Sequence, residues 1–395
     1  MKRFFLYTIL SFFLLLPSAG QAPANSNDSI RLSLLTCAPG EEIYSLFGHT
    51  AIRYENPSQR IDVVFNYGLF SFNTPNFIFR FSLGETDYQL GVTDYEHFAA
   101  EYAFYGRSVW QQTLNLTDEE KTKLIQLLQE NYRPENRVYR YNFFYDNCAT
   151  RPRDKIEESI AGKVVYPTEP QEGSRTFRDI VHQYCKGHPW ARFGIDLCIG
   201  SEADQPITQR QMMFAPFYLM DAFDGAQIFT DTYSRPLVKA NELIIDVTPK
   251  PDESGWMPTP LQCSLLLFIL TAAATIYGIR RRTGLWGIDL VLFGMAGIVG
   301  CVLAFLALLS QHPAVSSNFL LLVFHPGQLL FLPYIVYCVR KGKKCWYLTL
   351  NLVVLTLFIV LFPVIPQRFD FAVVPLALVL LIRSASNLIV TSKKK

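Results

Sequence analysis

The chain lacks the features that mark several common classes of protein. Its net charge is only +2 over 395 residues, and it has no basic stripe with interleaved aromatic residues, so no nucleic-acid partner is expected. Neither common glycine-rich phosphate-binding pattern occurs. The eight cysteines and six histidines include no CxxC or HxxxH spacing, which argues against a zinc site. We therefore expect neither a metal nor another cofactor.

The N-terminus has the architecture of a secretory signal. Lys2 and Arg3 precede a short apolar stretch, residues 4–16, and small residues follow Pro17. This pattern predicts a signal peptide over residues 1–22, with a retained anchor as the alternative. No cysteine stands at the cleavage site, so the protein is not expected to be a lipoprotein itself.

Long stretches of the second half of the chain have little charge. Each apolar run is near the length of a membrane-spanning helix, although the last two need their flanking residues to reach across. The runs predict five spans, at residues 261–279, 287–309, 319–339, 346–361 and 371–382. Basic residues fall in alternate connections, at 280–282, 341–344 and 393–395. The positive-inside rule then places these connections and the C-terminus in the cytoplasm, and the N-terminal region outside it.

The region between signal and membrane is predicted to be one α+β domain, residues 23–248, joined by a linker, 249–260, to the membrane domain, 261–395. Alternation and turn residues predict strands at 30–35, 88–92, 108–114 and 237–247. Capping residues and periodicity predict helices at 94–105, 117–131, 149–160 and 176–184.

Two further β-rich runs, on either side of Asn56-Pro57-Ser58-Gln59, predict a hairpin. A four-residue turn gives a register in which His49 faces Asn66 and Arg53 faces Asp62. The second pair is a cross-strand ion pair. The first pair places an amide beside an imidazole, where it can orient the ring and select its tautomer.

The stretch 141–154, YNFFYDNCATRPRD, contains the strongest chemical signal. A proline is tolerated in the first turn of a helix, so Pro152 indicates that a helix begins near Ala149. Cys148 then lies at or beside the N-cap, where unpaired N–H groups and the helix dipole favour a thiolate. A buried structural cysteine is the alternative for this residue.

Cysteine acyl chemistry needs a thiolate, a base, a group that orients the base, and donors for the oxyanion. Cys148, His49 and Asn66 are the candidates for the first three, and the backbone N–H of Cys148 for the fourth. His on one strand, Asn on the next and Cys at a helix start make the papain-like set in permuted order. A core histidine and a structural amide are the alternatives, and Asp62 is a second candidate for the orienting group.

Three further side chains near Cys148 are candidates for substrate binding. Arg151 and Arg153 add positive charge, and Tyr145 ends an aromatic run that serves either acyl-chain binding or core packing. Cys185 and Cys198 are a possible disulfide pair, whereas a bridge to Cys148 would disable its thiolate.

The chain resembles the lipoprotein N-acyltransferase family called Lnb in three motifs, FGHTAIR, FNYGLF and NCATRPRD. The segment GIDLCIGSEADQPIT supports the resemblance. The resemblance covers nearly the whole mature chain, including the five predicted spans. It implies a permuted papain-like soluble domain, NlpC-like or lecithin:retinol acyltransferase-like, followed by an all-α five-helix membrane domain.

The resemblance also implies an activity. Cys148 would take an acyl group as a thioester, with His49 as base and then acid, and pass it to the N-terminal amine of a diacylglyceryl lipoprotein. Lipoproteins and membrane lipid would be the partners, at the inner membrane. The alternatives are a cell-wall peptide amidase or peptidase and a non-catalytic membrane sensor. The acyl donor, its chain length and the oligomeric state stay open.

Overall fold

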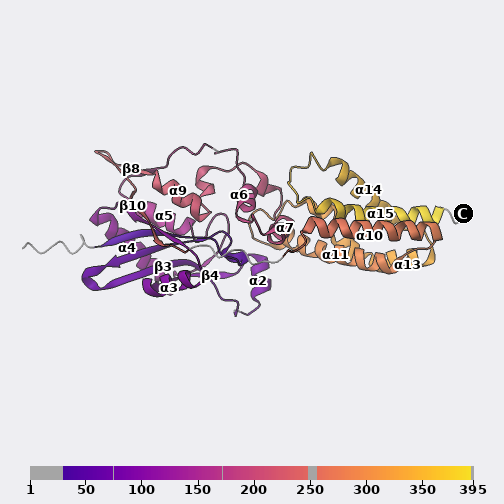
Figure 1. Ribbon diagram of the computed structural model, residues 1–395, viewed down its shortest axis with the longest axis horizontal. Helices are drawn as coiled ribbons and strands as arrows, with labels where there is room; N and C mark the ends of the chain where they lie inside the picture. The colour runs from indigo at the N-terminus through magenta and orange to yellow at the C-terminus, as the bar shows by residue number, and fades with distance from the viewer. Residues whose placement is uncertain (1–29, 74, 171, 248–255, 393–395) are drawn as a thin grey trace, which may run out of the picture.

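The computed structural model describes residues 30–73, 75–170, 172–247 and 256–392. The predicted signal peptide and most of the predicted linker lie outside the described residues. Figure 1 shows a domain of strands and helices at the left and a group of long helices at the right. The predicted order, an α+β domain followed by an all-α region, is confirmed.

A seven-stranded sheet forms the centre of the first domain (Figure 1). Its strand order is β10-β5-β1-β2-β3-β4-β6, and all neighbours pair antiparallel. Every strand except β6 lies close to a predicted one. The strands are β1 (Arg31–Cys37), β2 (His49–Asn56), β3 (Ile61–Leu69), β4 (Asp87–Asp94), β5 (Val109–Leu114), β6 (Val138–Arg140) and β10 (Val238–Ile245).

The β2–β3 hairpin forms, but its predicted register is wrong by two positions. The loop occupies residues 57–60, one residue later than the predicted turn, and Asn66 pairs with Ala51 rather than with His49. Side chains alternate between the two faces of a strand, so an even-numbered shift leaves each side chain on its predicted face. His49 and Asn66 therefore become diagonal neighbours instead of direct ones.

The predicted ion pair between Arg53 and Asp62 forms across the same diagonal. Arg53 Nε donates to Asp62 Oδ1 at 2.8 Å, and its Nη2 donates to Oδ2 at 2.7 Å. The guanidinium also stacks over the ring of Tyr95, with 3.3 Å between the guanidinium carbon and the ring centroid. Asp62 is thus engaged by Arg53, away from the imidazole for which it was a second candidate.

Helices cover both faces of the sheet. On one face, α3 packs Phe98 and Tyr102 against Leu35 and Val64. The other face carries the larger set of helices, and a small sheet lies beside them. The helices are α3 (Tyr95–Phe104), α4 (Asp118–Tyr132), α5 (Thr150–Ser159), α6 (Phe177–Tyr184), α7 (Pro189–Cys198), α8 (Gln209–Met212) and α9 (Pro216–Asp224). The small sheet contains β7 (Lys163–Val165), β8 (Gln227–Phe229) and β9 (Ser234–Pro236).

The helical region differs from five uniform spans. Three helices in the described residues are long and apolar enough to cross a membrane: α10 (Pro260–Arg281), α11 (Trp286–Leu309) and α15 (Val373–Ser392). The third predicted span is broken into η4 (Phe319–Leu322), α12 (Pro326–Leu330) and α13 (Leu332–Lys341), with a bend of 74°. The fourth, α14 (Trp346–Leu361), is a shorter apolar helix. The count of five therefore stays a prediction.

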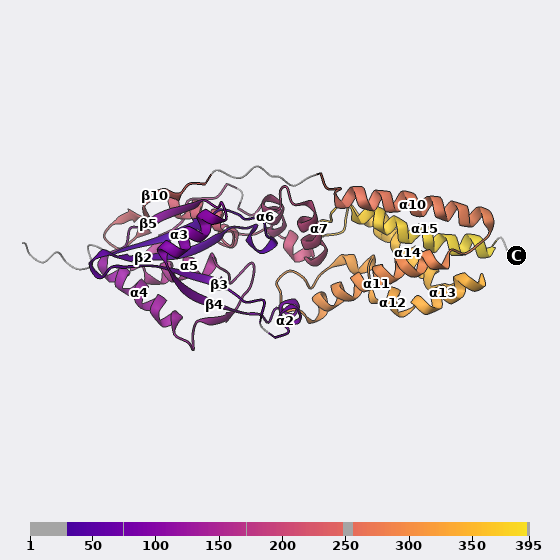
Figure 2. The same ribbon diagram turned by 60° about the horizontal axis from the view of Figure 1, so that its bottom comes forward.

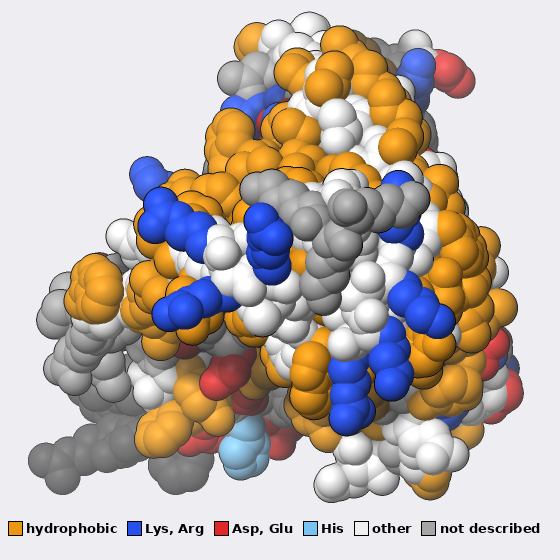
Figure 3. Space-filling model, turned by 90° about the vertical axis from the view of Figure 1, so that its right-hand side faces the viewer, with side chains coloured by type: hydrophobic (Ala, Val, Ile, Leu, Met, Phe, Trp, Pro, Cys, Tyr) orange, Lys and Arg blue, Asp and Glu red, His pale blue; other side chains and the backbone are white. Residues whose placement is uncertain are grey.

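Lysine and arginine side chains gather at the end of the helical region that faces away from the sheet domain (Figure 3). Arg280 and Arg281 form the last turn of α10, and Arg340 and Lys341 the last turn of α13. The basic connections identified in the sequence therefore meet at one end of the helices, as alternating spans require.

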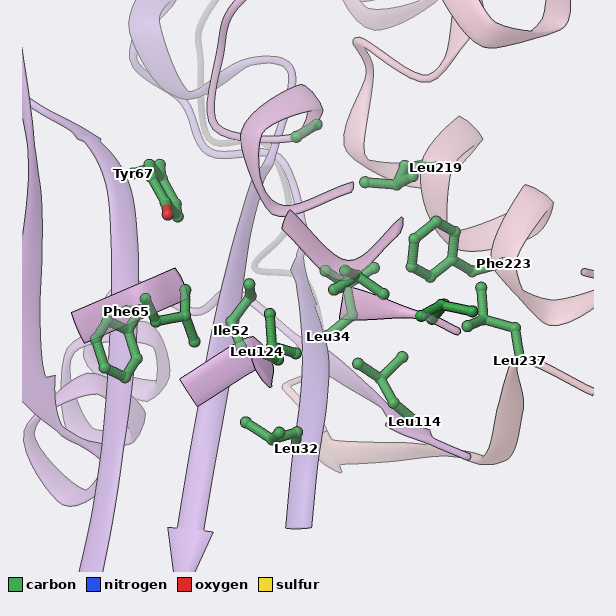
Figure 4. Packing of buried hydrophobic residues seen from close by; sticks show 14 of the residues in the cluster. Leu32, Leu34, Ile52, Phe65, Tyr67, Leu114, Leu124, Leu219, Phe223 and Leu237 are labelled. Carbon is green, nitrogen blue, oxygen red and sulfur yellow. The ribbon is translucent and has the colours of Figure 1, made fainter. Parts of the chain in front are cut away.

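The main core of the sheet domain lies between the sheet and the helices of its larger side. Figure 4 shows Leu34, Ile52 and Phe65 on adjacent strands facing Leu124 of α4 and Leu219 of α9. Leu34, Ile52, Leu124 and Leu219 are fully buried. Burying one such side chain contributes roughly 1.5–3 kcal/mol to folding. This packing holds the central strands in place and so positions the residues at their ends.

The loop between α11 and η4 binds the sheet domain directly. The backbone N–H of Gly200 donates to the carbonyl of Ala314 at 2.6 Å, and that of Ser201 donates to Ser317 at 2.9 Å. Asn318 Nδ2 donates to the carbonyl of Leu197 at the end of α7. The two domains therefore contact each other through their own surfaces, in addition to the chain that links them.

Candidate active site

Cys148 lies beside the N-cap of α5, as predicted, but the free N–H groups of the helix start are already bound. Helix α5 begins at Thr150 with Ala149 at its N-cap. The side-chain oxygen of Asn147 accepts hydrogen bonds from the N–H groups of Ala149 and Thr150, at 2.8 and 2.9 Å. Asn147 is buried and donates to the carbonyls of Phe143 and Phe214, so its orientation is fixed.

His49 and Asn66 form the predicted pair. His49 Nε2 lies 3.2 Å from Asn66 Oδ1, and Asn66 Nδ2 donates to Thr93 Oγ1 on the neighbouring strand. Because the amide nitrogen is used by Thr93, the amide oxygen faces the imidazole. The proton of the neutral ring therefore belongs on Nε2, which leaves Nδ1 as the basic nitrogen.

The fold brings Cys148 to the ends of the same two strands. The backbone N–H of Thr50, the residue after His49, lies near enough to the thiol to lower its pKa. On β3, a Cβ added to Gly68 would lie only 3.6 Å from the Cβ of Cys148, and Gly68 has φ +90°. The backbone angle favours glycine there, and the added Cβ would also lie 3.3 Å from Cε2 of Tyr141, which is a tight contact. Cys148, far from His49 and Asn66 in sequence, therefore lies at the end of β2 and β3 that carries the His49–Asn66 pair.

Burial keeps the two reactive groups neutral. It raises the pKa of the Cys148 thiol, although the Thr50 N–H, the Tyr141 hydroxyl and the charge of Arg107 act in the opposite direction. Burial also lowers the pKa of His49 to about 4, despite the bond to Asn66. At neutral pH the resting pair is a thiol and an uncharged imidazole. The thiolate expected from the helix start is therefore not the resting state.

Tyr141 is a member of the site that the sequence did not single out from its aromatic run. Its hydroxyl points at the Cys148 sulfur, with 4.0 Å between oxygen and sulfur. Burial raises the pKa of Tyr141 well above its ordinary value, so the group stays a hydroxyl and a donor. Its ring stacks on Tyr88 of β4, with 4.3 Å between centroids.

Comparison with known families assigns both domains of the chain. A family model of the Lnb N-terminal periplasmic domain matches residues 22–182, and one of the Lnb transmembrane domain matches residues 252–395. The chain belongs to the Lnb family. The sheet domain is accordingly the periplasmic domain, and the helical region is the transmembrane domain. No curated protein and no solved structure matches this chain.

In this Lnb protein, the two predicted arginines next to Cys148 are held by acidic partners. Arg151 forms two hydrogen bonds to Asp146, at 2.6 and 2.7 Å, and lies over the ring of Tyr139. Arg153 is buried and paired with Asp154. The local charge that the sequence predicted beside Cys148 is therefore largely compensated.

Tyr145, the third predicted substrate-binding residue, is exposed on the loop before Cys148. Its ring packs edge-on against Phe177 at the start of α6. An exposed side chain at this position could contact a substrate, and Tyr145 is not part of the buried core.

The positive charge that acts on the Lnb site comes instead from Arg107, in the loop between α3 and β5. Its charge lowers the pKa of both Cys148 and His49. Arg107 Nε donates to the carbonyl of Ala38 at 2.7 Å, and among the described residues its buried Nη2 has no hydrogen-bond partner. No local sequence pattern identifies this residue, because only the folded sheet brings it to the site.

The remaining predictions about cysteines and metals concern residues away from this site. Cys185 and Cys198, the possible disulfide pair, are both free thiols in the structure. Within the described part of the chain, no group of three or more His, Cys, Asp or Glu side chains is placed to hold a metal ion.

Proposed function

We propose that this protein is a membrane-bound lipoprotein N-acyltransferase. It moves an acyl chain from a lipid ester, through a thioester on Cys148, to the N-terminal amine of a diacylglyceryl lipoprotein. The main support is that Cys148 lies at the same end of β2 and β3 as the His49–Asn66 pair, in a periplasmic domain that contacts its own membrane domain. The membrane-bound setting favours a lipid substrate over a soluble cell-wall peptide.

For the soluble domain we propose the permuted papain-like class. Its support is the order of the reactive residues along the chain. The base His49 and its partner Asn66 stand on adjacent strands, and the nucleophile Cys148 comes later, before helix α5. Unrelated folds converge on this arrangement because the chemistry requires the same contacts.

The first half-reaction begins from the neutral pair. Nδ1 of His49 accepts the thiol proton as the Cys148 sulfur attacks the carbonyl carbon of the ester. The N–H of Thr50 stabilises the developing thiolate, and the N–H of Cys148 is the proposed donor to the oxyanion. The C–O ester bond then breaks, the alkoxide takes the proton from His49, and the acyl group stays on sulfur as a thioester.

The second half-reaction transfers the acyl group to the lipoprotein. The N-terminal amine attacks the thioester carbon, and His49 accepts the amine proton. The C–S bond breaks, an amide forms, and the proton returns from His49 to the Cys148 sulfur. Asn66 keeps the ring oriented through both steps by accepting from Nε2. The site ends in the state in which it began.

We place the protein in the inner membrane with its C-terminus in the cytoplasm. The gathering of lysine and arginine at the far end of the helices supports this orientation (Figure 3). The alcohol product of the first step would then be released on the periplasmic side. Lipoproteins and membrane lipid are the proposed partners.

The decisive experiment compares mass spectra of lipoprotein N-terminal peptides from three strains. They carry the wild-type chain, the Cys148→Ser variant, or a deletion of the gene. We expect both altered strains to lose the acyl chain on the terminal amine. A serine at this position is a poor nucleophile in a site built around a thiol, so transfer should stop while the fold persists.

The matched control is Cys198→Ser, which changes another half-buried free thiol, on α7. Its peptides should be those of the wild-type strain. If all strains give the same spectra, lipoprotein acylation is the wrong reaction. If deletion removes the acyl chain but Cys148→Ser does not, the reaction is right and the nucleophile is wrong.

A further inference from the structure

Helix α2 (Phe77–Leu83) has an unusual surface for a periplasmic element. None of its seven residues is buried, yet most are large and apolar. Ile78 is 80% exposed and Phe79 is 58% exposed. A contiguous exposed apolar surface of this kind marks contact with a partner or a membrane.

The helix lies against the periplasmic end of the membrane helix α11. The rings of Phe79 and Phe305 are 5.9 Å apart, and Phe305 belongs to the last turns of α11. His312 Nε2 donates to the carbonyl of Phe81 at 2.6 Å, just beyond the end of α11. Figure 2 shows α2 projecting from the sheet domain toward α11. This position is the boundary between the hydrocarbon and the headgroups, where aromatic residues of membrane proteins collect.

The single charge on α2 is compensated within the protein. Arg80 Nη2 donates to the carbonyl of Glu85 at 2.9 Å and to the carboxylate of Asp87 at 2.7 Å. A charged group is costly in hydrocarbon unless it is paired. The ion pair therefore removes the main obstacle to placing α2 in the membrane.

A continuous series of aromatic rings connects α2 with the sulfur of Cys148. Successive centroids are 4.3, 5.1, 5.8 and 5.9 Å apart, and the first ring carries the hydroxyl that contacts the sulfur. We call this series the aromatic path; it consists of Tyr141, Tyr88, Phe70, Phe77 and Phe81.

A second apolar segment lies beside the aromatic path. Tyr44 packs edge-on against Phe70, with centroids 6.1 Å apart, and against Phe72. Tyr44 and Ile43 are both strongly exposed and stand a few residues before His49. The exposed apolar residues Ile43 and Tyr44 thus lie beside the aromatic path, in the segment that leads into His49.

We propose that α2 is immersed in the outer leaflet of the inner membrane and that the aromatic path guides a lipid acyl chain from the leaflet to Cys148. The inference rests on the proposed function, because it names Cys148 as the acyl acceptor. Moving the methylene groups of an acyl chain from the leaflet into water is unfavourable. The acyl chain therefore needs apolar contacts all the way from the leaflet to Cys148. The rings supply that cover, and the segments that carry them extend from α2 to the neighbourhood of Cys148.

The first test detects the lipid directly and does not depend on catalysis. A photoreactive benzophenone amino acid replaces Ile78 in the full chain, reconstituted in vesicles of phosphatidylethanolamine and phosphatidylglycerol. After illumination, peptides that contain position 78 should carry lipid adducts. The control places the same amino acid at Tyr233, which is half-exposed in the β8–β9 hairpin, at the end of the sheet domain remote from the membrane helices (Figure 1).

Adducts at position 78 and their absence at position 233 support immersion of α2. Equal adduct yields at the two positions, or none at position 78, would overturn it. An adduct of position 78 with a protein instead of lipid would show that α2 binds a protein partner, which also contradicts the proposal.

The second test measures acyl transfer by Ile78→Asp and by the matched variant Tyr233→Asp. Two acyl donors are used: a diacyl phospholipid in the vesicles, and a water-soluble short-chain thioester that acylates Cys148 without the membrane. A carboxylate in hydrocarbon is strongly disfavoured, so Ile78→Asp should reduce transfer from the phospholipid by about tenfold or more. Acylation by the soluble donor should not change, and Tyr233→Asp should behave as wild type with both donors.

Equal activity of Ile78→Asp and wild type with the vesicle donor would refute the path. A wild-type protein that acylates Cys148 but transfers nothing to lipoprotein would instead contradict the proposed function. In that case the crosslinking result still decides whether α2 is immersed in lipid.

Discussion

At the scale of single residues, the central property of the site is that His49 and Cys148 both rest uncharged. Burial lowers the pKa of His49 to about 4, and it raises that of Cys148 above its ordinary value. A preformed thiolate–imidazolium pair would need the opposite: a lowered pKa for the Cys148 thiol and a raised pKa for His49. The thiol must therefore lose its proton during the attack, when a bound substrate is in place. This arrangement protects a periplasmic cysteine from oxidation and alkylation between turnovers, because the thiolate is the reactive form.

The neutral resting pair predicts how the alkylation rate of Cys148 depends on pH. Because the folded thiol has a raised pKa, its thiolate fraction should increase about tenfold per pH unit throughout the neutral range. The rate of iodoacetamide labelling, followed on the Cys148 peptide by mass spectrometry, should rise without a plateau between pH 5 and pH 8. The Cys198 peptide from the same digest is the internal control. A labelling rate that is already at its plateau at pH 5 and constant up to pH 8 would mean that the thiolate–imidazolium pair exists at rest.

At the scale of elements, the sequence predicted every strand of the main sheet except β6, and the helices α3, α4, α5 and α6, because alternation, periodicity and capping are local signals. The capping box of Thr117 and Glu120 at the start of α4 is one example. The hairpin contacts of His49 with Asn66 were also predictable, although the register was wrong, because a two-position shift preserves the faces of both strands.

Features that depend on distant residues were not predictable. Arg107 comes near Cys148 only in the folded sheet, and nothing near it in sequence marks it. Tyr141 lies in the marked stretch 141–154, but the sequence does not show which ring of the aromatic run faces the sulfur. Helix α2 was missed because residues 70–83 have no clear hydrophobic period. The absence of a period has a physical reason, since an element with apolar contacts on several sides has no polar face. The pairing of Asn147 with the start of α5 likewise removed donors that the sequence had assigned to Cys148.

The Asn147 side chain should therefore be critical for the element that carries Cys148. Asn147→Ala leaves two N–H groups and two carbonyls without their partners, in a buried position. We expect a loss of roughly 2–4 kcal/mol in the free energy of unfolding, from unsatisfied buried polar groups. The measurement is the midpoint of thermal unfolding in detergent, read from exposure of buried cysteine thiols.

The control for that variant is Thr117→Ala, which removes a helix cap far from Cys148 and should cost about 1 kcal/mol. Asn147→Ala should also change the rate at which iodoacetamide labels Cys148, whereas Thr117→Ala should leave that rate unchanged. Similar midpoints for both variants would show that Asn147 acts as an ordinary cap.

At the scale of the whole molecule, an ion-pair network crosses from the membrane domain into the sheet domain. Arg368, in the loop before α15, bonds Asp179 at 2.6 Å and Asp204 at 3.0 Å. Asp204 in turn bonds Arg178, which is fully buried and also paired with Asp196. Because several charges are shared and partly buried, the network fixes orientation better than isolated surface pairs do. We expect it to set the direction in which Cys148 and α2 face the bilayer.

The final prediction concerns this orientation. Arg368→Gln removes the ion pairs that the Arg368 side chain makes with Asp179 and Asp204, while the main-chain N–H of residue 368 and the Arg178 side chain keep their bonds to Asp204, so the sheet domain should stay folded. Transfer from a vesicle-bound acyl donor should fall roughly tenfold, because small misplacements of a reacting group are costly. Acylation of Cys148 by a water-soluble thioester should be unchanged. The matched control is Arg210→Gln: Arg210 is 51% exposed against 49% for Arg368, but its partners Asp154 and Glu157 lie within the sheet domain. If the two variants transfer acyl groups equally well from vesicles, the network does not orient the domains, and the backbone contacts of the loop before η4 must suffice.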